Sequence, residues 1–299
     1  MGYRQPDRFR IRPTDDGQGK AAMSTGKQLN RDLFSLAGKV AVVTGGTGIQ
    51  GVRIIRGLAA FGADVAVVDL DPELCETQAK ALCAEYGVRA IGVCCDVSQK
   101  DQVDAMVKRV VAELGGIHVL HNNAATKSKN PQDFFVPFED FSFDVWRDIM
   151  SVNLDGVFLV AQAVGKQMLS QGTGGSIIQV SSTYGVVGPD FRIYDGSQYM
   201  GFRISTPPAY SASKAAVCGL TRYLATWWGP KGIRVNTLVP GGIESGQNEV
   251  FQDNYGARVP LGRMANVDEM VGAVVYLASD ASSYMTGQMV VVDGGWTAW

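Results

Sequence analysis

Seven short runs of Val, Ile and Ala recur along the chain of 299 residues, and stretches with helical character separate them. The runs are almost continuously apolar, which is typical of strands whose sheet is covered by helices on both faces. They are Val40 to Thr44, Val65 to Asp69, Ala90 to Cys95, Ile117 to His121, Ser176 to Ser181, Arg234 to Val239 and Met289 to Val292. Strands that alternate with helices predict the α/β class, with one doubly wound parallel sheet of about seven strands.

The organisation along the chain indicates one domain. Residues 1–33 are polar and lack periodicity, so we expect a flexible extension there. No repeat or linker interrupts residues 34–299, which we predict to fold as a single unit. Two segments, Ala125 to Phe143 and Thr183 to Pro208, break the rhythm directly after predicted strands. Doubly wound sheets bind ligands beyond the carboxyl ends of their strands, so these segments mark the expected site.

Composition excludes several classes of function. Lys and Arg total 27 against 29 Asp and Glu, for a net charge of −2, which gives no basic face for nucleic acid or an anionic membrane. No uninterrupted apolar run approaches the roughly 18 residues that span a bilayer. We therefore expect a cytoplasmic protein with neither of these partners.

The cysteines and histidines predict no metal site. The cysteines are odd in number and have no Cys-x-x-Cys spacing, so we expect reduced, buried thiols. They are Cys75, Cys83, Cys94, Cys95 and Cys218. His118 and His121 lie three apart on a predicted strand and face opposite sides of the sheet, so one metal ion cannot take both.

A glycine-rich turn, Thr44 to Gly51, joins the first predicted strand to a helix that we expect to begin near Val52. Such glycines let backbone amides approach a pyrophosphate, which the helix N-terminus then stabilises. Asp69 ends the next strand eighteen positions past Gly51, where a carboxylate accepts hydrogen bonds from ribose hydroxyls and repels a 2′-phosphate. The pattern predicts a Rossmann-type domain that binds NAD rather than NADP; the alternative for Asp69 is a solvated strand end.

Tyr210 and Lys214 lie four apart on a predicted helix and therefore on one of its faces. A tyrosine has an ordinary pKa of about 10, and a nearby ammonium group lowers this pKa by favouring the phenolate. The pair can therefore act as a general acid/base. By itself, however, a Tyr and a Lys four apart are common on ordinary helices.

Taken together and in this order, seven motifs resemble the short-chain dehydrogenase/reductase family over Gly38 to Gly295. They are the glycine turn, Asp96-Val97, Asn122 to Ala125, Asn153, Ser181-Ser182, Tyr210-x-x-x-Lys214 and Pro240-Gly241. The resemblance implies that Ser182 hydrogen-bonds the substrate oxygen and Tyr210 transfers the proton. It also implies that Lys214 holds the nicotinamide ribose and lowers the pKa of the tyrosine, and that Asn153 anchors a water linking Lys214 to solvent.

The same resemblance implies a set of cofactor-binding residues along the turn and the strand ends. They are Gly45, Thr47, Gly48, Ile49, Gly51, Asp69, Asp96, Val97, Asn123, Ala124, Tyr210, Lys214, Pro240, Gly241, Ile243 and Ser245. Two features depart from the family pattern. The turn reads Thr-Gly-x-x-Gly-x-x-Gly instead of Thr-Gly-x-x-x-Gly-x-Gly, which leaves individual phosphate contacts open, and Ser182 precedes Tyr210 by 28 positions, about twice the usual distance.

The inserted residues predict the class of substrate. Arg192, Tyr194 and Arg203 are candidate substrate contacts together with Ser182, and Lys127 and Lys129 are further cations for a carboxylate or phosphate. Buried polar groups penalise an apolar ligand, so a polar loop favours a polyhydroxylated one. Alternatively, the loop packs on its own subunit or on a neighbour.

We expect an NAD-dependent dehydrogenase/reductase that acts on a secondary alcohol or ketone of a sugar, polyol or sugar acid. The chain resembles the gluconate 5-dehydrogenase-like or fructuronate/mannonate reductase-like members of the family. The family resemblance also implies that it forms a homotetramer or homodimer. Two alternatives remain: a 3-oxoacyl or other apolar-ketone reductase, and a non-catalytic NAD-binding regulatory or scaffold protein.

Overall fold

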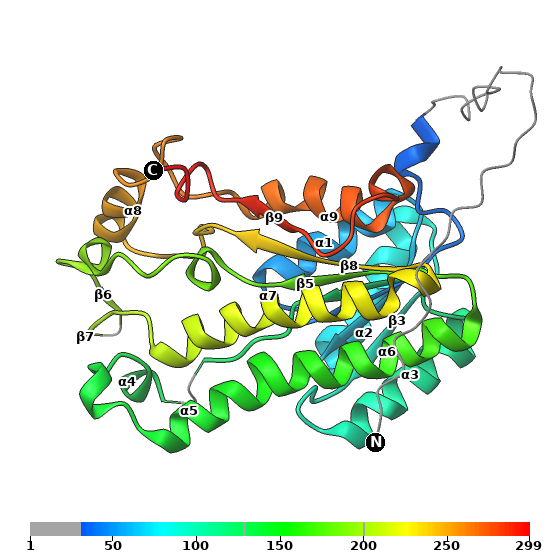
Figure 1. Ribbon diagram of the computed structural model, residues 1–299, viewed down its shortest axis with the longest axis horizontal. Helices are drawn as coiled ribbons and strands as arrows, with labels where there is room; N and C mark the ends of the chain where they lie inside the picture. The colour runs from blue at the N-terminus through cyan, green and yellow to red at the C-terminus, as the bar shows by residue number, and fades with distance from the viewer. Residues whose placement is uncertain (1–30, 128–129, 200) are drawn as a thin grey trace, which may run out of the picture. The chain divides into compact units, whose positions relative to one another are not determined.

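The computed structural model describes residues 31–127, 130–199 and 201–299 (Figure 1). Residues 32–299 form one compact unit. Most of the predicted extension, residues 1–30, lies outside the described residues, and its last part enters a 3₁₀ turn, Arg31–Phe34. The domain boundary at residue 34 therefore stays a prediction.

Seven parallel strands form the sheet in the order β3-β2-β1-β4-β5-β8-β9, which confirms the predicted fold class. They are β1 (Val40–Thr44), β2 (Asp64–Asp69), β3 (Ala90–Cys94), β4 (Val119–Asn122), β5 (Gly175–Val180), β8 (Ile233–Pro240) and β9 (Met289–Val292). The chain winds outward from β1 to β3 and then returns to place β4 beside β1. The topological switch point, where such sheets bind ligands, therefore lies between β1 and β4.

Helices cover both faces of the sheet (Figure 1). The longer ones are α1 (Ile49–Ala60), α2 (Pro72–Tyr86), α3 (Lys100–Leu114), α5 (Phe143–Met150), α6 (Val157–Gln171), α7 (Pro208–Trp228), α8 (Glu249–Gly256) and α9 (Val271–Ala278). Shorter elements are α4 (Pro131–Phe134), a π-turn at Ser151–Gly156, 3₁₀ turns at Phe138–Asp140, Thr183–Gly185, Phe191–Tyr194, Gly229–Lys231, Val267–Met270 and Asp280–Ser282, and a hairpin of β6 (Gln198–Tyr199) and β7 (Phe202–Arg203). The first helix begins three residues earlier than expected.

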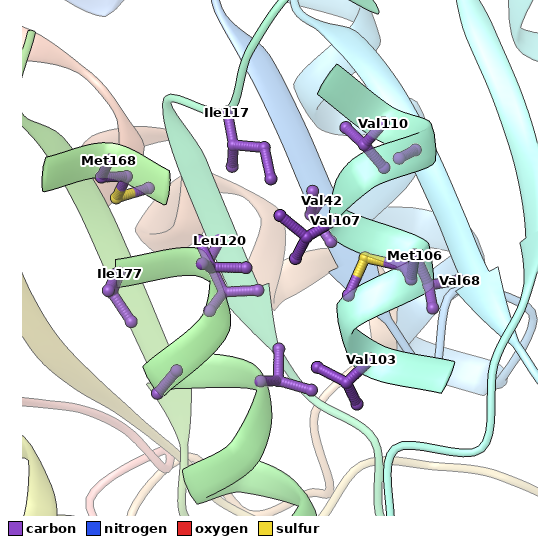
Figure 2. Packing of buried hydrophobic residues seen from close by; sticks show 14 of the residues in the cluster. Val42, Val68, Val103, Met106, Val107, Val110, Ile117, Leu120, Met168 and Ile177 are labelled. Atoms are coloured by element: carbon purple, nitrogen blue, oxygen red, sulfur yellow. The ribbon is translucent and has the colours of Figure 1, made fainter. Parts of the chain in front are cut away.

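The period of two along each strand divides the core into two layers. Val42 and Leu120 face α3, α6 and α7, where they pack with residues such as Met106 and Met168 (Figure 2). Val43, on the opposite face, packs with residues of α1, α2 and α9. Continuous apolar strands are thus needed because both faces are buried.

β4 begins at Val119, two residues later than expected. The Gln171 side chain accepts a hydrogen bond from the Ile117 amide and donates one to the Ile117 carbonyl, both at 2.8 Å. Ile117 is thus held by a side chain from the end of α6 and not by strand pairing. His118 accepts from the Val40 amide through Nδ1, whereas His121 is fully buried in the sheet.

Two sequence-based expectations about burial need revision. Cys83 and Cys94 are exposed, so the prediction of five buried thiols is wrong for these two. By length and composition alone, one helical stretch of the described residues, Phe143–Gln171, is long and apolar enough to cross a membrane. Buried core helices pass the same test, and Val160, Val164 and Met168 of this stretch pack against the sheet.

Candidate active site

The glycine turn connects β1 to α1 at the switch point. Gly45 has a φ of 66°, in the region that favours glycine. A Cβ on Gly51 would lie 2.0 Å from the Gly45 carbonyl oxygen, so α1 can pack against the turn only because residue 51 has no side chain. The first turn of α1 has no side-chain cap, and its amides suit a pyrophosphate. The atypical spacing places Ile49 at the first helical position, with its side chain 59% exposed.

Asp69, at the end of β2, is tied to the glycine turn. One carboxylate oxygen accepts hydrogen bonds from the Thr47 amide at 3.0 Å and the Thr47 hydroxyl at 2.6 Å. The other accepts from the Leu70 amide at 2.8 Å. These bonds fix the carboxylate beside the turn, so the acidic residue and the glycines belong to one cavity.

The Thr44 side chain joins the ends of β1 and β4. Its hydroxyl donates to the Asn122 side chain at 3.2 Å and accepts from the amides of Asn123 and Ala124 at 3.0 and 3.1 Å. The Asn123 side-chain amide donates to the Thr44 carbonyl at 3.4 Å. The floor of the switch point is therefore held rigidly by a polar network.

Two cavities meet at Asn123, Ala125 and Lys127. The larger, about 670 Å³, contains the predicted Gly45, Thr47, Gly48, Asp69, Asp96, Val97, Asn123 and Ala124. The smaller, about 350 Å³, which we call the catalytic cleft, contains the predicted Ile49, Asn123, Ser182, Tyr194, Tyr210, Lys214, Pro240, Gly241, Ile243 and Ser245. Gly51 lines neither because it lies beneath the turn. The two cavities share lining residues, and the larger one is lined by glycines of the turn, as the binding of a dinucleotide requires.

Ser182, Tyr210 and Lys214 converge in the catalytic cleft. Ser182 and Tyr210 line the same side of the site, and the Ser182 side chain is near enough to lower the pKa of the phenol. The Lys214 ammonium donates to the Val180 carbonyl at 3.0 Å and lies 5.8 Å from the centre of the Tyr210 ring. Position 210 is in the first turn of α7, which begins at Pro208, so the helix projects the phenol to the carboxyl end of β5.

The two titrating groups of this cluster have shifted pKa values. Burial raises the pKa of the Tyr210 phenol above its usual value, while the neighbouring Ser182 side chain acts in the opposite direction. Burial lowers the pKa of Lys214 from 10.5 to about 8, so most of the amine still carries its charge at pH 7. A buried ammonium group beside a buried phenol favours the phenolate, which opposes the effect of burial.

Asn153 lies on the π-turn between α5 and α6, and π-turns are frequent at functional sites. Its side-chain oxygen Oδ1 accepts from the Thr126 backbone amide at 2.7 Å, and its side-chain amide donates to the Thr126 backbone carbonyl at 3.3 Å. α7 packs against this turn. The structure thus brings Asn153 to the helix that carries Tyr210 and Lys214, and fixes it through Thr126, which the sequence did not single out.

The structure does not bring the predicted Arg192 and Arg203 to the catalytic cleft. Arg192 makes two hydrogen bonds of 2.8 Å to the Asp190 carboxylate and its side chain is 74% exposed. Arg203 pairs with Asp195 at 3.1 Å and is 80% exposed. Both guanidinium groups therefore meet acidic residues of the same loop. Lys127 lines the cavities, whereas Lys129 lies outside the described residues.

Aromatic residues that the sequence did not single out line or support the catalytic cleft. Tyr184, Phe251 and Tyr255 line it together with Tyr194. The Tyr255 ring stacks on Trp296 of the C-terminal segment with centroids 4.7 Å apart, and the Gly242 amide donates to the Tyr255 hydroxyl. The sequence could have identified Tyr184 as a residue of the cleft, because it follows Ser182 by two residues. No local pattern marks the others, which come from distant parts of the chain.

The loop after β8 is braced by Gln247. Its side-chain oxygen accepts from the Ser245 amide at 2.7 Å, and its side-chain amide donates to the Ile243 carbonyl at 3.0 Å. Gln247 itself lines the catalytic cleft. The predicted Ile243 and Ser245 are thereby held facing the cluster of Ser182 and Tyr210.

A parallel sheet with a glycine turn at its switch point, opposite a buried Tyr-Lys pair, defines a class: oxidoreductases that use a nicotinamide dinucleotide. A sequence profile of the family described as enoyl-(acyl carrier protein) reductase matches residues 47–297. D-Threitol dehydrogenase of Mycolicibacterium smegmatis is 36% identical, over 92% of this chain and 99% of its own length. The chain belongs to the short-chain dehydrogenase/reductase family, as the sequence predicted.

Solved structures agree with this assignment. Gluconate 5-dehydrogenase from Burkholderia cenocepacia, in complex with NADP and tartrate, superimposes with a TM-score of 0.79 at 35% identity, over 90% of this chain and 98% of its own. An NAD⁺-bound xylitol dehydrogenase has a TM-score of 0.76 at 31% identity, over 87% and 99%. The chain is therefore an enzyme of the dehydrogenase type that acts on CH–OH groups.

Proposed function

We propose that this protein transfers a hydride between NAD and a secondary alcohol or ketone of a sugar, polyol or sugar acid. The observation that carries the proposal is the convergence of Ser182, Tyr210 and Lys214 in a cleft that is continuous with a glycine-lined cavity. The named activities of the relatives, on threitol, gluconate and xylitol, support the class of substrate.

Each residue of the cleft has a separate role in alcohol oxidation. Ser182 donates a hydrogen bond to the substrate oxygen, and the Tyr210 phenolate takes the hydroxyl proton while the carbon–hydrogen bond breaks. A bound nicotinamide supplies the acceptor for the hydride, or its donor in the reverse direction. Lys214 stabilises the phenolate and holds the nicotinamide ribose. Asn153 anchors the water through which Lys214 exchanges protons with solvent.

The cavity residues give the rest of the cofactor site. Gly45, Thr47 and Gly48 hold the pyrophosphate, while Asp96 and Val97 border the adenine. We propose that Asp69 accepts hydrogen bonds from the adenosine ribose and repels a 2′-phosphate, so that NAD is preferred. One solved relative holds NADP and another holds NAD⁺, so the ratio of kcat/KM for the two cofactors is the decisive measurement. A ratio in favour of NADP would overturn the role of Asp69.

A panel of substrates separates the proposed function from its alternatives. Absorbance of the reduced cofactor should report turnover with tetritols, pentitols and aldonates. Faster reduction of 3-oxoacyl thioesters or apolar ketones would instead establish an apolar-ketone reductase, for which the described match to an acyl carrier protein reductase profile is the supporting observation. Cofactor binding without turnover of any substrate would indicate a regulatory or scaffold protein.

We also propose that residues 34–299 are the catalytic domain of a cytoplasmic homotetramer or homodimer. Support for the assembly comes from β9, whose Met289 and Val291 side chains are exposed at the edge of the sheet. Multi-angle light scattering should give a mass of two or four chains, and a monomer would contradict the proposal. Cell fractionation tests the location.

A further inference from the structure

A second cavity lies on the other side of Tyr194 from the catalytic cleft. It measures about 810 Å³ and is mostly apolar, with a lining of Phe135, Val136, Pro137, Phe138, Pro189, Phe191, Tyr194, Arg203, Ile204, Ser205, Thr206, Pro207, Pro208 and Ser211. We call it the apolar cavity. Its walls are the segment around α4 and the end of the inserted loop, which lie near the β6–β7 hairpin (Figure 1). Because Tyr194 lines both spaces, its side chain stands at their junction.

Tyr194 is fixed in this place by contacts on both sides. Its hydroxyl shares a hydrogen bond with Thr206, which lines the apolar cavity, and donates one of 3.4 Å to Tyr184, which lines the catalytic cleft. Its ring lies 5.5 Å from Phe251 and 6.4 Å from Phe191, measured between centroids. The residue is only 7% exposed. Swinging the ring aside would break both hydroxyl contacts and unpack the ring, so an entering ligand cannot displace it cheaply.

We propose that Tyr194 is the wall that ends the substrate site, and that it limits the enzyme to compact polyhydroxylated substrates by closing the catalytic cleft off from the apolar cavity. The catalytic cleft, about 350 Å³, is at the small end of ligand sites, and part of it faces the nicotinamide position beside Lys214. Of the two tyrosines, Tyr184 supplies the hydroxyl for a polyol, because the Tyr194 hydroxyl is engaged by Thr206 and Tyr184. The inference rests on the proposed function and adds the residue that sets substrate size.

The test compares three variants. Tyr194→Ala removes the wall, Tyr194→Phe keeps the ring without its hydroxyl, and Phe191→Ala removes a 57% exposed ring that lines the apolar cavity but not the catalytic cleft. Each is assayed with threitol and with 1-phenyl-1,2-ethanediol, and the readout is the kcat/KM for 1-phenyl-1,2-ethanediol divided by the kcat/KM for threitol. This ratio should rise about ten- to a hundredfold in Tyr194→Ala, as expected when a pocket gains room for an apolar group. It should stay unchanged in the other two variants.

Two results would refute the proposed role of Tyr194. One is an unchanged ratio in Tyr194→Ala, and the other is an equal rise in Tyr194→Phe, which would assign the effect to the hydroxyl. If Tyr194→Ala fails to fold, Tyr194→Leu also opens the junction and keeps more of the packing.

Calorimetric titration with 1-phenyl-1,2-ethanediol gives a readout that does not need turnover, and Tyr194→Ala should bind it at least tenfold more tightly than the unchanged protein. If Tyr194→Ala binds 1-phenyl-1,2-ethanediol more tightly but no diol is turned over, the proposed function is refuted and the role of Tyr194 as the wall of the cleft is supported. Turnover of threitol with no gain in binding or ratio would refute the wall and retain the function.

Discussion

Replacing Lys214 by Met is expected to stabilise the fold at neutral pH while it abolishes activity. The ammonium group is buried, and burial lowers its pKa from 10.5 to about 8. At about 1.4 kcal/mol for each pKa unit, keeping this charge in the folded protein costs about 3 kcal/mol. Methionine has a similar length without the charge, but it leaves the buried Val180 carbonyl without its hydrogen bond from a charged group, which costs about 2 kcal/mol. The net gain in the free energy of unfolding should therefore be about 1 kcal/mol at pH 7.

The sign of the pH dependence follows from the direction of the shift. Between pH 8 and 10.5 the unfolded chain binds more protons at Lys214 than the folded chain does, so the stability of the unchanged protein rises with pH in this range. The variant has no such group. Its advantage should therefore be complete below about pH 8 and disappear as the pH approaches 10.5.

Urea denaturation of both proteins, followed by tryptophan fluorescence at one protein concentration, measures this difference from pH 7 to 10.5. Lys166→Met, which removes an exposed lysine of α6, is the matched control and should stay within about 0.5 kcal/mol of the unchanged protein. A variant at position 214 that is less stable at pH 7, or a difference that does not vary with pH, would refute the reasoning.

Four further predictions concern the cofactor and proton sites. Tyr210→Phe should lower kcat by at least a hundredfold and leave the Kd for NAD nearly unchanged; retained turnover would remove this residue from the proton transfer. Asp69→Ala should weaken NAD binding and shift the kcat/KM ratio toward NADP, so an unchanged ratio would leave Asp69 without that role. Gly51→Ala forces a Cβ to within 2.0 Å of the Gly45 carbonyl oxygen, so it should destabilise the fold by about 1–3 kcal/mol and weaken NAD binding. The control is Gly219→Ala on α7, which has open space around it and should be neutral or slightly stabilising. Trp296→Ala should destabilise the fold by about 3 kcal/mol and also weaken NAD binding by loosening the loop after β8; destabilisation with unchanged NAD binding would restrict the residue to packing.

The sheet could be predicted because each strand carries its own signal. Val40–Thr44 and Met289–Val292 have the bounds expected from their apolar runs, since strands buried on both faces need apolar residues throughout. The late start of β4 was not predictable, because it depends on the Gln171 side chain, which follows Ile117 by 54 residues. The approximate length and the type of a strand follow from its own residues, whereas a strand boundary that a distant side chain sets cannot be predicted from the local sequence.

The chemical part of the site was also accessible from sequence because its members have fixed local spacings. The glycine turn requires residues that are consecutive, and Tyr210 and Lys214 share a helix face through a spacing of four. The charge of Arg192 predicts a substrate contact, but the structure does not place this residue in the catalytic cleft. Asp190, two residues before it, offers a nearer partner, and a carboxylate at that spacing captures the guanidinium group before any ligand can.

The walls of the catalytic cleft come from segments that are far apart in the chain, which explains why sequence patterns missed them. Tyr184 and Tyr194 belong to the inserted loop, Phe251 to α8, and Trp296 to the C-terminal segment, which reaches the cleft through Tyr255. None of these elements carries Ser182, which follows β5, or Tyr210 and Lys214, which lie on α7. A change in the inserted loop or in α8 can therefore alter the size of the substrate without moving Ser182, Tyr210 or Lys214. Because Tyr194 lines both the catalytic cleft and the apolar cavity, a single substitution there changes the cleft wall without touching the elements that carry Ser182, Tyr210 and Lys214.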